Sequence, residues 1–405
     1  MTPAPLRRLS RSLTQTLPVT VALAGLLMMP APGSAQCEVG GKAGSSLLFP
    51  YFEVDLSSDA GLTGLISLNN ESNTATMTRV IVWTDWGIPV LAFDVYLLPR
   101  DVQTMNVRDL LNGVIPSTGT GADLSSFTNC NVVPPFHSNP ALPALQSSQL
   151  KAYLTGVPGP GDALCAGESY GDNHARGYIT VDATKACAGI GATSPNITPL
   201  HANYFSTVTT TKNVLWGDLL YVDPSENSAQ GVEGINLVAD ASLQAPNTNT
   251  FYGRYHSWDG RDRRSPLPTI WTTRFLNGGV FDGGTDLIVW RDTHSNSVTK
   301  KTCGLHPSWY PLKSSFVTAR DEDTALALSL GTNNEFPLAT QRVPISSVGP
   351  GPTALFGRIQ VSLEIPPSGL PAGAWVIPIM TASGRFSVDF NGQPLNSGCG
   401  LVPAL

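Results

Sequence analysis

Charged side chains are scarce in this chain of 405 residues, and several patterns that carry chemistry are missing from it. Charged residues make up 13% of the sequence, and there are only six histidines. No CxxC, CxH, HxH or HExxH spacing occurs, which argues against zinc ligation by the cysteines, the alternative to disulfides, and gives no support to a catalytic transition metal. No phosphate loop, dinucleotide fingerprint or haem attachment motif appears. We therefore expect no cofactor of these kinds and no nucleotide-dependent chemistry.

Helical periodicity is also nearly absent. Instead, short apolar and β-branched runs are bounded by Gly, Pro, Asn and Asp, a pattern typical of strands joined by turns. The 39 glycines and 33 prolines are too many for long helices and suit many turns. The sequence predicts an all-β fold, a β-sandwich or jelly-roll of antiparallel sheets in one or two β-domains with long Gly/Pro-rich loops.

The strand candidates are spread along the chain. They are residues 62–68, 78–83, 90–98, 178–182, 213–222, 234–239, 286–290, 355–365, 374–380 and 385–390. Two short segments, 107–114 and 321–330, resemble helices with acidic residues near their starts, although the second alternates and could equally be a strand.

The expected organisation has three parts. Residues 1–35 resemble a signal peptide, residues 36–200 form an N-terminal β-domain, and residues 201–405 form a C-terminal β-domain. Residues 116–171 are rich in Ser, Gly, Pro and Asn and are expected to form an extended excursion or a linker without long elements. An alternative is that the two β-parts share one sheet system.

The first 35 residues have the three parts of a secretory signal in the required order. Three arginines and no acidic residue come first (Arg7, Arg8 and Arg11), followed by an apolar core at residues 17–29 and by small residues ending at Ala35. This core is too short to span a bilayer. We expect cleavage after Ala35 and export to the periplasm, the cell surface or the medium, with no membrane span in the mature chain.

Cleavage would remove only basic charges, so the mature chain is three units more negative than the full chain at −6. Such a balance argues against nucleic acid or an anionic membrane as a main partner, although a local basic patch remains compatible with it.

All six cysteines follow the expected cleavage point, and an even number in an exported chain favours disulfides. They are Cys37, Cys130, Cys165, Cys187, Cys303 and Cys399. Keeping each bridge inside a plausible domain favours three pairings, namely Cys165 with Cys187, Cys303 with Cys399, and Cys37 with Cys130.

The sequence GESYG at residues 167–171 satisfies the G-x-S-x-G pattern of serine hydrolases, with Ser169 as the nucleophile. That motif needs a strand before the serine and a helix after it, whereas Gly and Pro precede it here. A glycine-rich turn beside Cys165 explains the same five letters. If the motif were catalytic, the base would be His201, His256, His294 or His306, with Asp240, Asp286 or Asp292 as the acid.

The densest mixture of aromatic and charged residues is FYGRYHSWDGRDRR at residues 251–264. Rings stack on sugars or peptides, and charged groups orient them, so this segment is a candidate binding surface. The binding candidates in it are Tyr252, Tyr255, His256, Trp258, Asp259 and Arg261. The alternative is a hairpin or loop whose rings pack on the sheet while its charges pair in solvent.

Two further features have structural explanations. Residues 80–85 read VIVWTD and residues 287–292 read LIVWRD, and tryptophans at such strand ends are more often core than cleft. Oxygen-rich turns at residues 55–59, 223–227 and 282–286 raise a structural calcium ion, but ordinary Asx turns explain them better.

These features favour an exported non-enzymatic β-protein that interacts with a surface, a matrix or a ligand such as a glycan or another cell-surface component. The alternative is a secreted hydrolase acting on an ester, a peptide or a glycan, with Ser169 as its nucleophile.

Overall fold

The computed structural model describes most of the chain beyond residue 40. The described residues are 41–137, 141–193, 195, 197–244, 250–253, 261–292, 298–305, 307, 316–321, 336–348, 355–363, 373–383, 386–389 and 391–396. They all belong to one compact unit, Ala35–Leu405. The fold is all-β with antiparallel sheets, as the sequence predicts.

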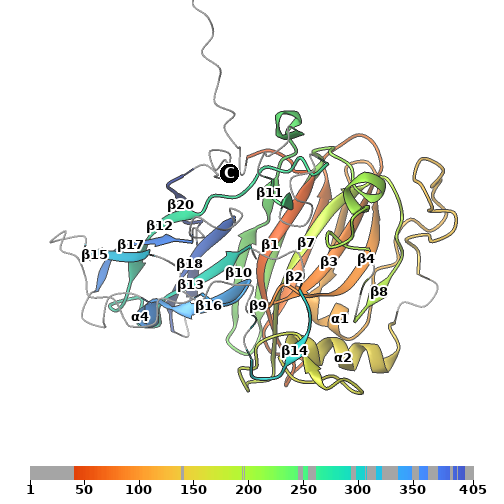
Figure 1. The fold of residues 1–405 in the computed structure, drawn as a ribbon. Helices are drawn as coiled ribbons and strands as arrows, with labels where there is room; N and C mark the ends of the chain where they lie inside the picture. The colour runs from red at the N-terminus through yellow and green to blue at the C-terminus, as the bar shows by residue number, and fades with distance from the viewer. Residues whose placement is uncertain are drawn as a thin grey trace, which may run out of the picture. The chain divides into compact units, whose positions relative to one another are not determined.

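Two sheets contain the strands nearest the N-terminus (Figure 1). The first sheet has, in spatial order, β11 (Ile235–Leu237), β1 (Ser46–Asp55), β7 (His174–Thr184), β3 (Thr76–Thr84), β4 (Pro89–Leu97) and β8 (Gly191–Ala192). The second sheet has β10 (Ser228–Glu233), β9 (Leu215–Asp223), β2 (Thr63–Asn70) and β5 (Val102–Asn106). The two sheets pack closely at Gly217, because a Cβ atom there would lie 2.8 Å from the ring of Phe49.

Two more sheets form from the later strands. The third sheet has β15 (Phe316–Asp321), β17 (Phe356–Ser362), β12 (Ile270–Leu276) and β20 (Gln393–Pro394). The fourth has β16 (Thr340–Pro344), β13 (Gly284–Arg291), β18 (Ala374–Ala382) and β19 (Phe386–Asp389). These sheets share a core in which the rings of Trp271 and Trp375 lie 4.7 Å apart. A short ribbon pairs β14 (Lys301–Thr302) with β6 (Leu164–Cys165).

Helices are few and short among the described residues. They are α1 (Val107–Leu111), α2 (Ala144–Leu154), α4 (Ile345–Val348), a π-helical turn (Tyr204–Val208) and a 3₁₀ turn (Ala241–Gln244). The side chain of Asn106 caps α1 by accepting a hydrogen bond from the backbone N–H of Arg108 at 2.9 Å. In the described part of the chain, no helix is both long and apolar enough to cross a bilayer.

Every predicted strand has a counterpart in the structure, and the helix predicted at residues 107–114 is confirmed as α1. Residues 116–171, expected to form an excursion without long elements, contain one helix that was not predicted, because α2 occupies the proline-free stretch after Pro143. Its buried residues Leu150, Tyr153 and Leu154 recur at helical spacing. The candidate at 321–330 lies outside the described residues except for Asp321, the last residue of β15.

Strands on both sides of residue 200 share sheets. β9 pairs with β2 over eight residues, and β11 pairs with β1. The fourth sheet also contacts β1, since the hydroxyl of Thr340 donates to the carbonyl of Pro50 at 2.5 Å. The division into domains near residue 200 stays a prediction.

Candidate functional site

A cleft lies where β1 and β9 of the first two sheets face the fourth sheet. It consists of two adjoining pockets of about 220 and 260 Å³, which share Tyr51, Glu53 and Arg342. We call it the Arg342 cleft. Because a single guanidinium and a single carboxylate serve both pockets, a ligand in either one would contact the same pair of charges.

One wall of the Arg342 cleft is a face of the fourth sheet. Antiparallel pairing sets Ile288 opposite Arg342, Asp286 opposite Ile379, and Thr381 opposite Ser387. Residues two apart on a strand, such as Asp286 and Ile288, point to the same face. This wall therefore combines apolar, hydroxyl and charged groups.

Arg342 is oriented by a single ion pair. Its Nε atom donates to Oδ2 of Asp286 at 2.8 Å, and its side chain remains 35% exposed. Its two terminal nitrogens make no hydrogen bond to any residue in the described part of the chain. A guanidinium held through Nε presents both terminal N–H groups to a ligand.

Glu53 on the opposite wall is held by three neighbours. Tyr51 donates its hydroxyl proton to Oε2 at 2.9 Å, while His174 Nδ1 and Arg176 Nη2 lie 2.8 and 2.6 Å from Oε1. Burial alone would raise the pKa of Glu53. The hydrogen bond with His174 and the charge of Arg176 outweigh burial and lower this pKa to about 2. Glu53 is therefore a fixed negative charge at neutral pH.

Arg176 joins this cluster to the GESYG segment. It forms a two-point pair with Asp172 at 2.9 and 2.5 Å, and its guanidinium carbon lies 4.4 Å from the centre of the Tyr170 ring. Tyr170 is 46% exposed and lines the pocket of about 260 Å³. The hydrogen bond with Glu53 is the main influence that raises the pKa of His174 above its ordinary value.

Metal-ligating atoms of Glu53, Asp172 and His174 lie within 4.8 Å of one another. Arg176 already bonds both carboxylates, so a cation there would have to displace a guanidinium. The carboxylates in two of the proposed calcium turns accept backbone N–H groups, Asp55 from Ser57 and Asp223 from Ser225. Structural calcium stays a prediction.

Ser169 lies in irregular chain between β6 and β7 and is exposed. The segment after it leads into β7, which begins at His174, so the helix that a nucleophile elbow requires is replaced by a strand. Of the four histidines proposed as its base, His201 lies 3.3 Å from the hydroxyl of Thr198, and His256, His294 and His306 lie outside the described residues. The catalytic role of Ser169 stays a prediction.

The 251–264 segment is described only at its ends. Tyr252 is 1% exposed, and its hydroxyl donates to Asp182 at 3.2 Å. Arg261 is exposed. The remaining binding candidates, Tyr255, His256, Trp258 and Asp259, lie outside the described residues. The binding role of the segment stays a prediction.

Tyr252 belongs to a buried polar cluster, which we call the Asp182 cluster. Arg264 lies 3.4 Å from Asp182 and 3.1 Å from Asp262, and Tyr204 donates to Asp182 at 2.7 Å. Arg264 and Asp182 are fully buried. The cluster attaches residues 262–264 to the centre of the first sheet.

The tryptophans at the two similar strand ends belong to the core, as predicted. Trp83 and Trp290 are each 1% exposed. The ring of Tyr178 lies between them, 5.6 Å from Trp83 and 5.9 Å from Trp290. The two strand ends with similar sequences therefore meet at one ring.

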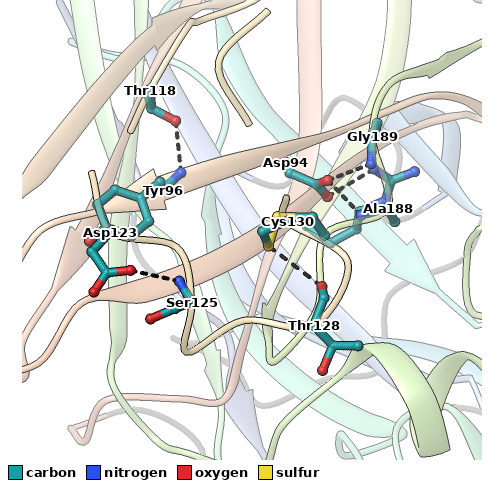
Figure 2. The surroundings of a disulfide bond; sticks show 11 residues. Asp94, Tyr96, Thr118, Asp123, Ser125, Thr128, Cys130, Ala188 and Gly189 are labelled. Atoms are coloured by element: carbon teal, nitrogen blue, oxygen red, sulfur yellow. Dashed lines mark hydrogen bonds and ion pairs between the residues drawn. A yellow bond between two sulfur atoms is a disulfide. The ribbon is translucent and has the colours of Figure 1, made fainter. Parts of the chain in front are cut away.

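Two disulfides lie within the residues that the structure describes, and all three predicted pairings are wrong. Cys130 bonds Cys187, and Cys165 bonds Cys303. Figure 2 shows the first, where Cys130 lies beside Thr128 and the backbone N–H groups of Ala188 and Gly189 reach Asp94. Cys37 and Cys399 lie outside the described residues.

Strand pairing explains the observed bridges. The backbone N–H of Cys187 donates to Thr128 at 2.9 Å, which brings it beside Cys130, while Cys165 lies opposite Lys301 in the β6–β14 ribbon. The prediction kept each bridge on one side of residue 200, whereas the bridge between Cys165 and Cys303 crosses that position. The bridges indicate an oxidising compartment.

Sequence reasoning missed the residues that build the Arg342 cleft. Tyr51 and Glu53 lie on β1, a strand that contains Pro50 and was not predicted. Arg342 lies on β16, a short strand with few apolar residues. The only available indication was the alternation of polar and apolar residues in YFEV, because TQRV has three polar residues in succession. No protein-family model matches this sequence, and no curated protein matches it.

Proposed function

We propose that this chain is an exported, non-enzymatic binding protein that takes a polar ligand, of the saccharide class, in the Arg342 cleft. The signal-like pattern of residues 1–35 and the two disulfides support export to the periplasm, the cell surface or the medium.

The observation that carries the proposal is the pair of adjoining pockets that share a guanidinium with open terminal nitrogens. Ligand sites are concave and combine apolar surface with a few oriented polar groups. Arg342 donates hydrogen bonds there, and Glu53 is a carboxylate acceptor that stays ionised at neutral pH because its pKa is about 2.

A saccharide fits this mixture of groups. Its hydroxyls both donate and accept hydrogen bonds, and its C–H faces pack on aromatic rings. The cleft offers hydroxyls from Ser228, Thr381 and Ser387, together with the rings of Tyr170 and Tyr221.

A glycan array read with fluorescently labelled full-length protein tests the proposal. The wild type should bind a subset of saccharides, and both Arg342→Gln and Tyr170→Ala should reduce those signals about tenfold, as expected for losing a charge-assisted hydrogen bond or an aromatic contact. Lys212→Gln, an exposed substitution outside both pockets, is the matched control. Signals that survive both cleft substitutions in folded protein would place the ligand elsewhere, and a wild type that binds no saccharide would refute the ligand class.

A further inference from the structure

A further pocket of about 340 Å³ lies at one end of the first sheet. Strand pairing sets its floor, because it places Tyr96 of β4 and Thr184 of β7 on either side of Met77 of β3. Thr184 follows Asp182 by two residues on β7, so it points to the same face of the sheet as the Asp182 cluster. We call this cavity the Thr184 pocket. It shares no lining residue with the Arg342 cleft.

One wall of the Thr184 pocket, formed by residues 123–127, is tied to the sheet. The backbone N–H of Thr128 donates to the carbonyl of Lys185 at 2.9 Å, and that of Cys187 donates to the carbonyl of Thr128 at 2.9 Å. The disulfide between Cys130 and Cys187, shown in Figure 2, adds a covalent link at the same place. The wall therefore has a fixed position relative to the floor, so a ligand would find the pocket already formed.

Thr184 offers a buried hydroxyl that the fold leaves without a partner. The residue is 3% exposed, and its Oγ1 atom makes no hydrogen bond to any residue in the described part of the chain. Burying an unpaired hydroxyl costs free energy. A ligand oxygen that reaches this hydroxyl would restore the missing hydrogen bond.

Two aromatic rings form the main apolar surface of the Thr184 pocket. The ring centres of Tyr96 and Phe127 lie 6.0 Å apart with their planes at 84°, which is an edge-to-face pair. Ala75 adds a methyl group beside them. A flat aromatic ligand can extend this pair with a ring of its own.

An ammonium group without a counter-charge also lines the pocket. Lys212 is exposed and forms no ion pair or hydrogen bond within the residues that the structure describes. Lys185, the second lysine of the lining, donates to the carbonyl of Ser206 at 2.8 Å. The carboxylate of Asp123 accepts the backbone N–H of Ser125 at 2.9 Å instead of pairing with a lysine (Figure 2). Lys212 is therefore free to pair with an anionic ligand.

We infer that the Thr184 pocket binds a small aromatic carboxylate that carries a hydroxyl on its ring. The ring packs against Tyr96 and Phe127, the carboxylate pairs with Lys212, and the ring hydroxyl bonds Thr184. Sites for small ligands typically combine a concave apolar surface with a few oriented polar groups in this way. The pocket is separate from the Arg342 cleft, so the inference does not depend on the saccharide proposal.

Other ligand classes fit these groups less well. A neutral saccharide would leave Lys212 without a counter-charge. Phosphate groups are usually bound by helix N-termini or by successive backbone N–H groups, and none of the described lining residues lies in a helix. A fatty acid would place an apolar chain against Thr184 and leave its hydroxyl unpaired.

Isothermal titration of the full-length protein with para-hydroxybenzoate tests the inference. Lys212→Gln should weaken this binding about tenfold, because it removes a charge-assisted hydrogen bond. The same substitution should leave the affinity for para-hydroxybenzamide unchanged, since that ligand has no charge to pair with the lysine.

Thr184→Val removes the hydroxyl and retains the shape of the side chain. It should weaken the binding of para-hydroxybenzoate about fivefold, as expected for the loss of one neutral hydrogen bond. Benzoate, which lacks the ring hydroxyl, should bind equally well to wild type and variant. The melting temperature should not fall, because the substitution removes an unpaired buried hydroxyl.

Two matched controls separate this pocket from charge in general and from the Arg342 cleft. Lys151→Gln removes a positive charge on α2, outside the pocket, and should leave the affinity for para-hydroxybenzoate unchanged. Arg342→Gln should leave it unchanged as well. In the glycan array, conversely, Lys212→Gln should retain the saccharide signals that Arg342→Gln reduces.

The inference is overturned if para-hydroxybenzoate does not bind the folded protein, if para-hydroxybenzamide binds as tightly as the acid, or if Lys212→Gln retains full affinity. It is also overturned if Thr184→Val weakens benzoate as much as para-hydroxybenzoate, or if inorganic phosphate displaces para-hydroxybenzoate at equal concentration.

Discussion

Arg264 and Arg358 are the same residue type in opposite environments, one buried and the other exposed to solvent. Arg264 is fully buried between two carboxylates and beneath the rings of Phe205 and Tyr252, whereas Arg358 is exposed between two other arginines. A buried guanidinium must be compensated inside the fold, because burying an unpaired charge costs several kcal/mol. An exposed one is hydrated, so its compensation can come from a partner. The difference separates an arginine required for folding from one available for binding.

The largest expected effect is at the buried end of this comparison. Arg264→Met should lower the free energy of unfolding by about 3–5 kcal/mol, because Asp182 and Asp262 would remain buried without their cation. Urea denaturation followed by tryptophan fluorescence measures the loss. A change below about 1 kcal/mol would mean that the Asp182 cluster relaxes or admits water, and that burial does not distinguish the two arginines.

Glu53 and Arg176 form an intermediate case, a cluster that is only partly exposed. The folded-state pKa of Glu53 is about 2, below the ordinary value of 4.5, so the unfolded chain takes up its proton first as the pH falls. The stabilisation is therefore complete above about pH 4.5 and is lost as the pH falls towards 2, and it amounts to about 3 kcal/mol by linkage.

Glu53→Gln should remove that part of the pH dependence. The measurement is the difference in unfolding free energy between wild type and variant at several pH values, with the exposed substitution Glu226→Gln as a control. Parallel curves for wild type and Glu53→Gln would show that the cluster does not stabilise the ionised carboxylate.

The smallest effect is expected at the exposed end. Arg358→Gln should raise the free energy of unfolding by about 0.2–1 kcal/mol, because it removes the cation that lies between two others. The gain should shrink at high salt, where repulsion is screened. A loss of stability at low salt would show that Arg358 makes a net favourable contact in the free protein.

The sequence was sufficient to predict the strands but not their partners. Alternation and turn residues locate β3 and β13 because both properties are local. The strand β1 was missed because Pro50 interrupts it, and the structure accommodates the interruption with a shift of register between Phe49 and Phe52. Pairing of β1 with β7 then brings Glu53 opposite Arg176, a contact between residues that are far apart in sequence.

Other neighbours in the sheets also depend on such long-range pairing. Pairing of β17 with β12 and with β15 sets Arg358 opposite Arg274 and Arg320, and each of the three lies in an ordinary strand sequence. Nothing near Arg274 in the sequence indicates that Arg320 and Arg358 will be its neighbours on the sheet. The predicted disulfides were wrong for a related reason, since they were confined to the expected domains, whereas Cys165 bonds Cys303 across residue 200.

The bridge between Cys165 and Cys303 has a consequence for the order in which the molecule is completed. Its partners are separated by 138 residues, and a polypeptide is synthesised from its N-terminus. Cys165 therefore cannot form its native bridge until most of the chain has been made. During that interval it is accessible to oxidants and to the wrong cysteine, so a thiol–disulfide isomerase would shorten maturation more than it would stabilise the finished protein.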